Sequence, residues 1–336
     1  MERLNLTLFF DSEMSRRTCL RALAAGVAAL SPLAVSTPAG AQRLGRINMG
    51  YMKIADLSPM FIGLDKGYFK EVGVDLNLTS MVGGAAIAPA LASGSLNIGW
   101  SNTTSITIGV SKGFDFKFVC NGALNARGGN DAFGFVVHKD SGISSARDLA
   151  GKTVASNTLN NLPHLSGLFW IDHNGGDSSR VKWVEVPIPQ MEAALANKKI
   201  DGFVTTEPFI TVATSPGHPG KLMGHPLSEM APRVLIASYF SSDAWIEKNA
   251  DKVKAFIAAI SKGITYHNEH KEEAKAVIAK WSGLRPELVG QMKMPAFEVA
   301  MKESDIQVQA DLALKYRMIE RRVAAKELIS RHAPMA

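Results

Sequence analysis

The chain has 336 residues, of which 46% are hydrophobic and 20% are charged, and its mean hydropathy is close to zero. This composition is typical of a globular protein and excludes a disordered one, while the length favours two lobes over a single core. The formal charge of +6 is scattered, with no long run of Lys or Arg, which argues against nucleic-acid binding but would help to attract a small anion.

The N-terminus predicts an export signal. Arg16 and Arg17 precede an apolar stretch at 22–35, and residues 39–41 supply the small side chains that a signal peptidase recognises. The apolar stretch is too short to cross a bilayer as a stable helix. The arginine pair resembles a twin-arginine signal, with an ordinary secretory signal as the alternative. We therefore expect cleavage near Ala41 and a location in the periplasm.

Cysteine usage adds little to this interpretation. Cys19 lies in the signal, so Cys120 is alone in the mature chain and no internal disulfide is expected. Cys120 falls in a predicted strand, where we interpret it as a buried core residue and not as a catalytic thiol. No second stretch of sequence is apolar enough to span a membrane.

Strand-like and helix-like segments alternate along the mature chain, which is typical of an α/β protein with parallel strands. Helices are predicted at 59–72, where apolar residues recur at steps of three and four, and from Gly83 to residue 93. From residue 243 onward the chain is predicted to be almost entirely helical, with breaks at Pro286 and Pro295. The predicted strands are 47–51, 74–78, 96–100, 116–120, 133–138, 153–156, 182–186, 202–205 and 234–239.

Two segments of the sequence echo each other at an offset of 104 residues. Residues 90–97 (ALASGSLN) align with residues 194–201 (ALANKKID), and each leads into a short apolar strand and a hydroxyl-rich loop. Chance similarity of two helix–turn–strand units would explain the echo. Two similar α/β lobes would explain it as well, and their strand-end loops would then face each other across a cleft.

Four segments in a fixed order resemble one protein family. They are residues 63–74 (GLDKGYFKEVGV), 90–99 (ALASGSLNIG), 144–155 (SSARDLAGKTVA) and 206–209 (TEPF). Over roughly residues 45–270 the chain resembles the nitrate-, sulfonate- and taurine-binding proteins and their thiamine-precursor relatives, the substrate-binding proteins of ABC transporters. The resemblance is specific for the family and says little about the ligand.

The resemblance implies a two-lobed α/β architecture, the type II periplasmic binding protein fold, with a ligand cleft between the lobes. It implies that the first lobe comprises 42–128 and 238–336, including the C-terminal helices, and that the second comprises 129–237, after a signal peptide at 1–41. Such a protein closes on a small-molecule ligand and delivers it to the permease and ATPase subunits of the transporter. We expect it to act as a monomer.

Candidate binding residues lie where the first strands end. Tyr51 and Lys53 follow the first strand, with a solvated turn as the alternative. Gly83 and Gly84 let the backbone approach a ligand at a helix N-terminus, where free N–H groups suit an anion. A simple flexible turn would explain the two glycines equally well.

Short polar side chains follow two further strands. Those in the first lobe are Ser101, Asn102 and Thr103, and those in the second are Asn157, Thr158 and Asn160. Both groups offer hydrogen-bond donors to a ligand, and helix capping alone would also account for them.

Two charged residues complete the candidate site. Glu207 lies where members of the resembled family place a cleft-facing acid, with a loop carboxylate paired to a lysine as the alternative. Arg127 lies at the predicted crossing between the lobes, where it would clamp a carboxylate or sulfonate or remain a surface residue of the hinge.

No motif predicts catalysis, a cofactor or a metal site. The sequence lacks a nucleophile elbow, a P-loop, a zinc-protease helix motif and a C-x-x-C pair. His267 and His270 share a charged helical segment, which favours a solvated face over a metal site. The cysteine-rich motif of the pyrimidine-synthase relatives is also missing.

The sequence therefore predicts a periplasmic solute-binding protein of an ABC importer, not an enzyme, that captures a small organic anion. A sulfonate or carboxylate, aliphatic or aromatic, would fit the hydroxyl- and amide-rich loops. The main alternative is a pyrimidine or thiamine-precursor ligand, whose amino group Glu207 would accept. A secreted enzyme on the same fold is the second alternative.

Overall fold

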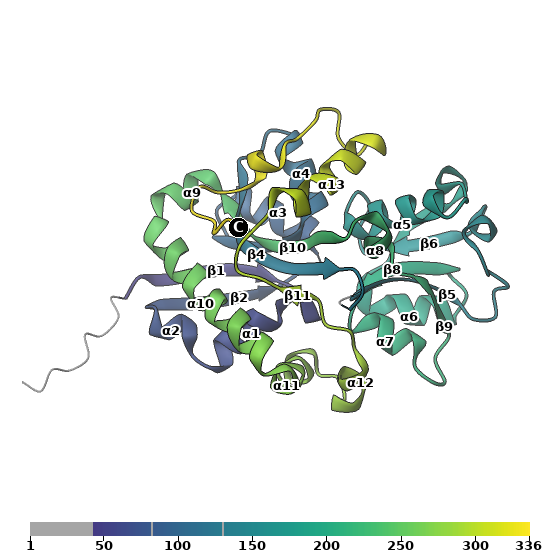
Figure 1. Ribbon diagram of the computed structural model, residues 1–336, viewed down its shortest axis with the longest axis horizontal. Helices are drawn as coiled ribbons and strands as arrows, with labels where there is room; N and C mark the ends of the chain where they lie inside the picture. The colour runs from purple at the N-terminus through teal and green to yellow at the C-terminus, as the bar shows by residue number, and fades with distance from the viewer. Residues whose placement is uncertain (1–42, 82, 130) are drawn as a thin grey trace, which may run out of the picture. The chain divides into compact units, whose positions relative to one another are not determined.

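Two β-sheets with helices on both faces organise the part of the chain that the computed structural model describes, residues 43–81, 83–129 and 131–336 (Figure 1). Residues 41–336 form one compact unit that contains both sheets. The predicted signal peptide, residues 1–41, and its cleavage site lie outside the described residues. No helix of the described ranges combines the length and the apolar character needed to cross a bilayer.

The first sheet has six strands in the order β11-β4-β10-β3-β1-β2. Strand β1 is parallel to β2 and β3, whereas β10 is antiparallel to β3 and β4. The strands are β1 (Gly45–Tyr51), β2 (Val74–Ser80), β3 (Ile98–Asn102), β4 (Phe116–Ala126), β10 (Arg233–Ser242) and β11 (Ala296–Phe297).

The second sheet has five strands in the order β7-β6-β8-β5-β9. They are β5 (Phe133–His138), β6 (Thr153–Ser156), β7 (Lys182–Glu185), β8 (Gly202–Thr206) and β9 (Gly220–Gly224). Strand β6 is parallel to β7 and β8, and β5 is antiparallel to β8 and β9. Both sheets therefore contain the predicted parallel strands but are mixed, because β5 and β10 enter from the other sheet and run antiparallel to their neighbours.

The two echoing segments occupy matching places in the two sheets. Strands β3 and β8 are each five residues long and begin 104 residues apart. Each lies between a parallel neighbour, β1 or β6, and an antiparallel neighbour, β10 or β5. The expected similarity of the two α/β halves is thus present in their strand order. The exact lobe boundaries at 129 and 237 remain a prediction.

Thirteen α-helices are present in the described ranges. They are α1 (Ser58–Asp65), α2 (Tyr68–Glu71), α3 (Gly84–Ala92), α4 (Thr103–Ser111), α5 (Leu162–His173), α6 (Ile188–Ala196), α7 (Phe209–Thr214), α8 (Pro226–Met230), α9 (Asp243–Lys248), α10 (Ala250–Glu269), α11 (Lys271–Ser282), α12 (Pro286–Gln291) and α13 (Glu303–Lys315). The single helix predicted over 59–72 is divided into α1 and α2, because Gly67 between them has a φ of +79°, which a glycine adopts without strain.

Apolar side chains cover both faces of the first sheet. In Figure 1, α1, α2 and α10 lie on one side of this sheet and α3, α4 and α13 on the other. Neighbouring residues of β10 point to opposite faces. The ring of Tyr239 contacts Phe256 of α10 at 5.2 Å, whereas Phe240 contacts Phe116 at 5.4 Å in the other core cluster. This two-sided burial fixes the ends of the strands, where the candidate loops begin.

The C-terminal segment corrects one prediction. After Lys315 the chain is not helical except for a short 3-10 helix, η4 (Ala325–Leu328). Arg317 has a φ of +57°, which ends α13. The segment then packs through buried apolar residues and pairs with β4, since the N–H of Ser330 donates to the carbonyl oxygen of Phe118 at 2.9 Å. Strand β9 was also not predicted, because its residues are only partly buried and lack a clear alternation.

Candidate functional site

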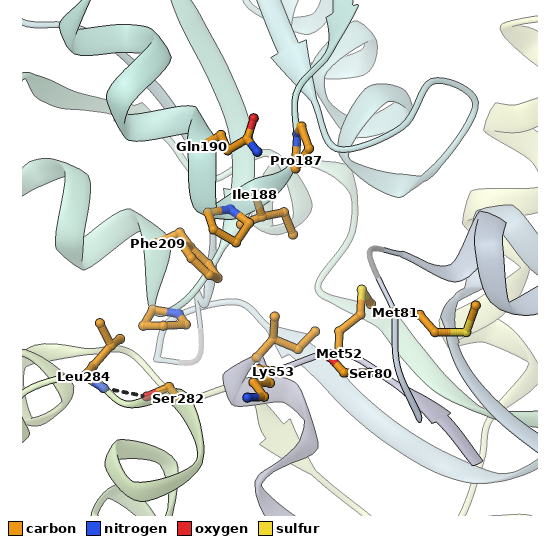
Figure 2. A pocket seen from close by; sticks show the side chains of 13 residues that line it. Met52, Lys53, Ser80, Met81, Pro187, Ile188, Gln190, Phe209, Ser282 and Leu284 are labelled. Atoms are coloured by element: carbon orange, nitrogen blue, oxygen red, sulfur yellow. Dashed lines mark hydrogen bonds between the residues drawn. The ribbon is translucent and has the colours of Figure 1, made fainter. Parts of the chain in front are cut away.

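A cleft of about 630 Å³ lies where strands of both sheets end (Figure 2). Residues 52–54 follow β1, and Ser80 and Met81 lie at the end of β2. From the second sheet, residues 187–190 follow β7, and Pro208 and Phe209 follow β8. Ser282 and Leu284, at the end of α11, complete the lining. The carboxyl ends of parallel strands are the usual place for ligands in open α/β sheets.

The wall of this cleft is mainly apolar. Nine of its thirteen described lining residues are Met, Ile, Leu, Phe or Pro, so most of the wall offers no hydrogen bond to a ligand. Figure 2 shows Ile188 and Phe209 on one side of the cleft and Met52 and Lys53 on the other. Phe209 and Ile188 are half-buried, so part of each side chain remains open to a solute.

Lys53 is the only charged side chain among the described residues that line the cleft. It is exposed, and within the described ranges its ammonium group has no hydrogen-bond or ion-pair partner. The cleft therefore combines an apolar wall with one unpaired positive charge. Ser80 and Gln190 add polar side chains with no bonded partner in the same described part of the chain.

Loops of the two sheets meet at a second place, which we call the polar junction: Gly83, Asn102, Asn157, Thr158 and Asn161. The Oδ1 atom of Asn102 caps α4 by accepting from the N–H of Ser105 at 2.8 Å, and it also accepts from Leu162 N–H at 3.2 Å. The Nδ2 group of Asn161 donates to Asn157 Oδ1 at 2.7 Å and to Thr158 Oγ1 at 2.9 Å.

The polar junction is tightly packed as well as hydrogen-bonded. A Cβ atom at Gly83 would lie 3.0 Å from Nδ2 of Asn157, so a larger residue would push this loop away. Asn161 is 1% exposed and caps α5 by accepting from the N–H of His164 at 3.0 Å. The structure thus brings the four candidates Gly83, Asn102, Asn157 and Thr158 together, but the polar side chains among them bond largely to one another and to backbone groups.

The remaining first-lobe candidates lie in the core or at helix starts. The ring of Tyr51 packs edge-on against Phe61 at 6.0 Å. Ser101 is fully buried and its Oγ has no partner in the described residues. The hydroxyl of Thr103 donates to the carbonyl oxygen of Leu235 at 2.8 Å. Gly84 begins α3.

Asn160 and Arg127 also lie away from the cleft's described lining. Asn160 has a φ of +54°, and its N–H donates to His164 Nδ1 at 3.1 Å. Arg127 is exposed at the crossing between β4 and β5, where its Nε donates to the carbonyl oxygen of Ser228 at 2.7 Å. It borders a different hollow, together with residues such as His173 and Glu229. A ligand in the cleft would therefore not reach Arg127 in this conformation.

Glu207 is a buried carboxylate beside the cleft, not part of its described lining. It is 4% exposed, and its two oxygens accept from the N–H and the hydroxyl of Thr211 at 3.0 and 2.9 Å. Burial raises the pKa of Glu207, and the hydrogen bonds from Thr211 and the charge of Lys293 oppose that shift. Both oxygens thus accept from Thr211 of α7, and the backbone N–H of Lys293 is a further donor to this carboxylate.

Asp56 forms a second buried carboxyl group that links the two sheets. It lies in the 3-10 helix η1 (Ala55–Leu57), is 2% exposed, and contacts Thr206 of β8 through Thr206 Oγ1 at 3.0 Å. The same hydroxyl lies 3.0 Å from the carbonyl oxygen of Ala132 and has only one proton to donate. When Asp56 is protonated, its own O–H donates to Thr206 Oγ1, and the Thr206 hydroxyl is free to donate to the carbonyl oxygen of Ala132. Burial raises the pKa of Asp56 to about 7.

Three residues with potentially reactive side chains, Ser58, His267 and Cys120, lie outside the described lining of the cleft. Ser58 Oγ and His267 Nδ1 are 2.9 Å apart, but both residues are buried beneath the surface, 0% and 1% exposed. The prediction that His267 lies on a solvated face is wrong, because its ring packs against Phe297 at 4.5 Å. Cys120 is buried, which raises the pKa of its thiol. Within the described ranges, no cluster of His, Cys, Asp and Glu could hold a metal ion.

Among the candidate binding residues predicted from the sequence, Lys53 lines the cleft, whereas the apolar residues Phe209 and Ile188 were not among them. Phe209 belongs to the TEPF segment quoted for the family resemblance, and Ile188 follows a predicted strand. Their places after strands were a usable signal. That signal is weak, because apolar residues after a strand more often belong to the core.

Comparisons with known proteins agree with this architecture. This chain is 22% identical over 306 residues, 86% of each chain, to a Bacillus subtilis (strain 168) protein. That protein is named as an aliphatic sulfonates-binding protein. The periplasmic aliphatic sulphonate binding protein of Escherichia coli has a similar structure, with a TM-score of 0.70 at 16% identity over 87% of this chain and 94% of that chain.

A nitrate-binding periplasmic protein of Synechocystis PCC 6803 is also similar, with a TM-score of 0.72 at 16% identity over 84% of each chain. The same fold occurs in an enzyme, a desulfurization enzyme with a TM-score of 0.61 at 12% identity over 86% of this chain and 97% of that chain. The model of the NMT1/THI5 like family matches residues 54–274, more than half of the sequence. The protein therefore belongs to the NMT1/THI5 like family and has the fold of the periplasmic binding proteins.

Proposed function

We propose that this protein is the periplasmic solute-binding component of an ABC importer and that it captures a small organic anion, a sulfonate or a carboxylate. The observation that carries the proposal is the unpaired Lys53 in a cleft whose other described lining residues are uncharged. An unpaired ammonium group at the mouth of an apolar cleft favours an anionic partner, because the low polarity of the wall strengthens the attraction.

The names of the relatives support the same ligand chemistry. Two of the similar proteins are named for sulfonates and one for nitrate, and all three names describe anions. Sulfonate and carboxylate groups both accept hydrogen bonds from an ammonium group and from short polar side chains. Ser80 and Gln190 stand in the cleft wall to supply such side chains.

The structure gives less support to a pyrimidine ligand. In that alternative, Glu207 would accept a hydrogen bond from the ligand's amino group. Both oxygens of Glu207 instead accept from Thr211, and the residue is outside the described lining of the cleft. The anion is therefore the ligand class that the geometry favours.

The experiment is a thermal-unfolding titration with hexanesulfonate, hexanoate and a pyrimidine, followed by recovery of the ligand for mass analysis. We expect the melting temperature to rise with the concentration of an anion, as mass action requires for a ligand that binds the folded state. The recovered anion should be chemically unchanged. No stabilisation by either anion would contradict the proposal, and a converted ligand would favour the enzyme alternative.

Ligand binding would bring the two lobes closer together around the cleft. The first lobe comprises residues 42–128 and 238–336, and the second comprises 129–237. Small-angle scattering should then report a smaller radius of gyration at saturating ligand. An unchanged radius with proven binding would contradict closure. We further propose that the protein acts as a monomer that docks on the permease.

Export is the remaining part of the proposal. Intact-mass measurement of periplasmic protein should show Gln42 as the first residue, and a mature chain that retains the arginine pair would contradict cleavage near Ala41. Changing Arg16 and Arg17 together to lysine should trap the precursor in the cell if export uses the twin-arginine route. Unchanged export would indicate the ordinary secretory route.

A further inference from the structure

Two hydrogen bonds in matching places join the half of the molecule built on the first sheet to the half built on the second. Asn102 and Thr206 are the last residues of β3 and β8 and keep the 104-residue offset of the echoing segments. Asn102 Oδ1 accepts from the N–H of Leu162, the first residue of α5, at 3.2 Å. Thr206 Oγ1 contacts Asp56, just before α1, at 3.0 Å. Each strand end thus holds the start of a helix that belongs to the other half.

The second of these contacts lies beside the cleft. Next to it, the backbone N–H of Ala55 donates to the carbonyl oxygen of Glu207 at 3.4 Å. Ile54 and Pro208, the chain neighbours of this backbone pair, both line the cleft. A movement of one half against the other that widens the cleft would therefore stretch these hydrogen bonds.

The two matching bonds differ in their response to pH. The amide of Asn102 does not titrate, whereas Asp56 is a carboxyl group that is 2% exposed and has no ion pair within the described ranges. The Thr206 hydroxyl has one proton for two acceptors, Asp56 and the carbonyl oxygen of Ala132, so both contacts are satisfied only when the carboxyl group is protonated. An ionised Asp56 would be a buried and unpaired charge, which is strongly unfavourable until water reaches it.

A second carboxylate acts on the charge of Asp56. The 3-10 helix η1 packs against β4 and α1 and bonds to β8, which carries no titratable residue. Directly after β8, the charge of Glu207 opposes the ionisation of Asp56. His267 bonds to Ser58 of α1, and burial lowers its pKa to about 4, so it supplies no positive charge near neutral pH. The other titratable residues of β4, of α1 and of the loop before η1 bond elsewhere, are buried and neutral, or line the cleft: Lys117, Asp65, Cys120 and Lys53.

We infer that Asp56 and Thr206 form a pH-sensitive latch between the two halves, which holds the cleft closed while Asp56 is protonated and releases it when Asp56 ionises. The inference rests on the proposed function, because it concerns the closure that ligand binding would cause. The ligand and the proton on Asp56 favour the same arrangement, so each strengthens the binding of the other. The protein should therefore hold its ligand tightly in acidic surroundings and release it more readily at alkaline pH.

The test is a calorimetric titration of hexanesulfonate, whose charge is constant over this range, into the unmodified protein at pH 5 and pH 8. Burial raises the pKa of Asp56 from 3.8 to about 7 where the latch is formed. The contribution of the latch is thus complete below about pH 4 and is lost as the pH rises to 7, by up to about tenfold in Kd per pH unit. The Kd should be about ten- to hundredfold higher at pH 8 than at pH 5. Equal Kd values would overturn the inference.

Two carboxyl variants identify the group that titrates. Asp56→Asn keeps a hydrogen-bonding side chain that cannot ionise, so its Kd should differ by less than about threefold between pH 5 and pH 8. Glu207→Gln should keep the pH dependence of the unmodified protein. A pH dependence that persists in Asp56→Asn, or that disappears in Glu207→Gln, would overturn the role given to Asp56.

A hydroxyl variant tests the latch from the other half, including the case in which Asp56→Asn protein does not fold. Thr206→Val removes the hydroxyl at nearly constant size and should raise the Kd at pH 5 by about tenfold. Thr214→Val, which removes a hydroxyl that bonds to Ile210 within α7, is the matched control and should leave the Kd unchanged. An unchanged Kd in folded Thr206→Val protein would contradict the latch.

Scattering from the ligand-free protein separates the latch from the proposed function. The radius of gyration should be larger at pH 8 than at pH 5 in the unmodified protein and equal at both pH values in Asp56→Asn protein. An unchanged radius with pH-independent sulfonate binding would overturn the latch and leave the proposed function standing. A pH-dependent radius with no sulfonate binding would support the latch and contradict the proposed function.

Discussion

The cleft and the polar junction are built from the same kind of loop, yet they use their residues in opposite ways. At the polar junction, the side chains of Asn102, Asn157, Thr158 and Asn161 bond to one another and to backbone N–H groups. In the cleft, Lys53 has no partner in the described ranges, and apolar side chains remain partly open. A polar group that is already satisfied holds loops together, whereas an unsatisfied one is free to bind a solute. Changes at the junction should alter stability, and changes in the cleft should alter affinity.

The largest expected effect concerns Asp56, the buried carboxyl group that links η1 to β8. Burial raises its pKa from 3.8 to about 7, so the folded protein holds a proton that the unfolded chain releases above pH 4. Its contribution to stability is therefore fully present below about pH 4 and is lost as the pH rises through 7. The loss is at most about 4 kcal/mol, from three pH units at ~1.4 kcal/mol each.

Asp56→Asn removes this titrating group. The unmodified protein should therefore lose stability relative to the variant as the pH rises from 4 to 8, measured as the difference between their free energies of unfolding. Denaturant unfolding at several pH values measures the difference. A difference that stays constant, or that grows with pH, would show that Asp56 is not protonated in the folded state.

Asn161→Ala tests the polar junction. The change removes the cap of α5 and leaves Asn157 and Thr158 without their shared donor. It should lower the free energy of unfolding by about 2–3 kcal/mol, the sum of a lost helix cap and unsatisfied buried groups. The Kd for hexanesulfonate should change less than threefold. Asn197→Ala, at an exposed residue that bonds only within its own helix end, is the control and should cost less than about 0.5 kcal/mol. A large loss of affinity in Asn161→Ala protein that is fully folded would place the ligand at the junction.

Glu207→Gln, beside the cleft, should affect the two candidate ligand classes, organic anions and amino-bearing heterocycles, differently. Because the oxygens of Glu207 accept from Thr211, the amide should leave the Kd for hexanesulfonate within about threefold of the original or make it lower. For an amino-bearing heterocycle, the same change should weaken binding by ten- to hundredfold, the equivalent of about 1.5–3 kcal/mol. Parallel titrations of both ligands decide between the classes, and strong weakening for the sulfonate would contradict the organic-anion assignment.

Arg127→Ala has the smallest expected effect. The side chain is exposed and bonds to the carbonyl oxygen of Ser228 at the crossing between the sheets, beside a different hollow. We expect no measurable change in the Kd for hexanesulfonate. Tenfold weaker binding would mean that closure brings Arg127 to the anion, the first of the two roles that the sequence left open.

Much of the fold could be predicted because its strands are strongly apolar and are bounded by clear turns. The predicted strands at 133–138 and 153–156 are confirmed to the residue as β5 and β6. The edge strand β9 and the chain after Lys315 were missed, because their conformation depends on the surfaces they pack against and not on a local pattern.

The candidate site was harder to predict than the fold. Lys53 was identified because it lies in the loop after the first strand, where open α/β sheets bind ligands. Asn102 and Leu162 bond across 60 residues of sequence, so no local signal showed that these loops would satisfy each other. Phe209 and Ile188 were missed for the opposite reason, since an apolar side chain looks the same in sequence whether it faces the core or a cleft.

The most direct test of the central claim is a calorimetric titration of hexanesulfonate into the unmodified protein, Lys53→Gln and the control Lys112→Gln. Lys112 is exposed at the end of α4, away from the cleft's described lining. We predict one binding site, a Kd that is ten- to hundredfold higher for Lys53→Gln than for the unmodified protein, and no change for Lys112→Gln. Equal affinity of all three proteins, or no binding by any of them, would contradict the account of an anion held in this cleft by Lys53.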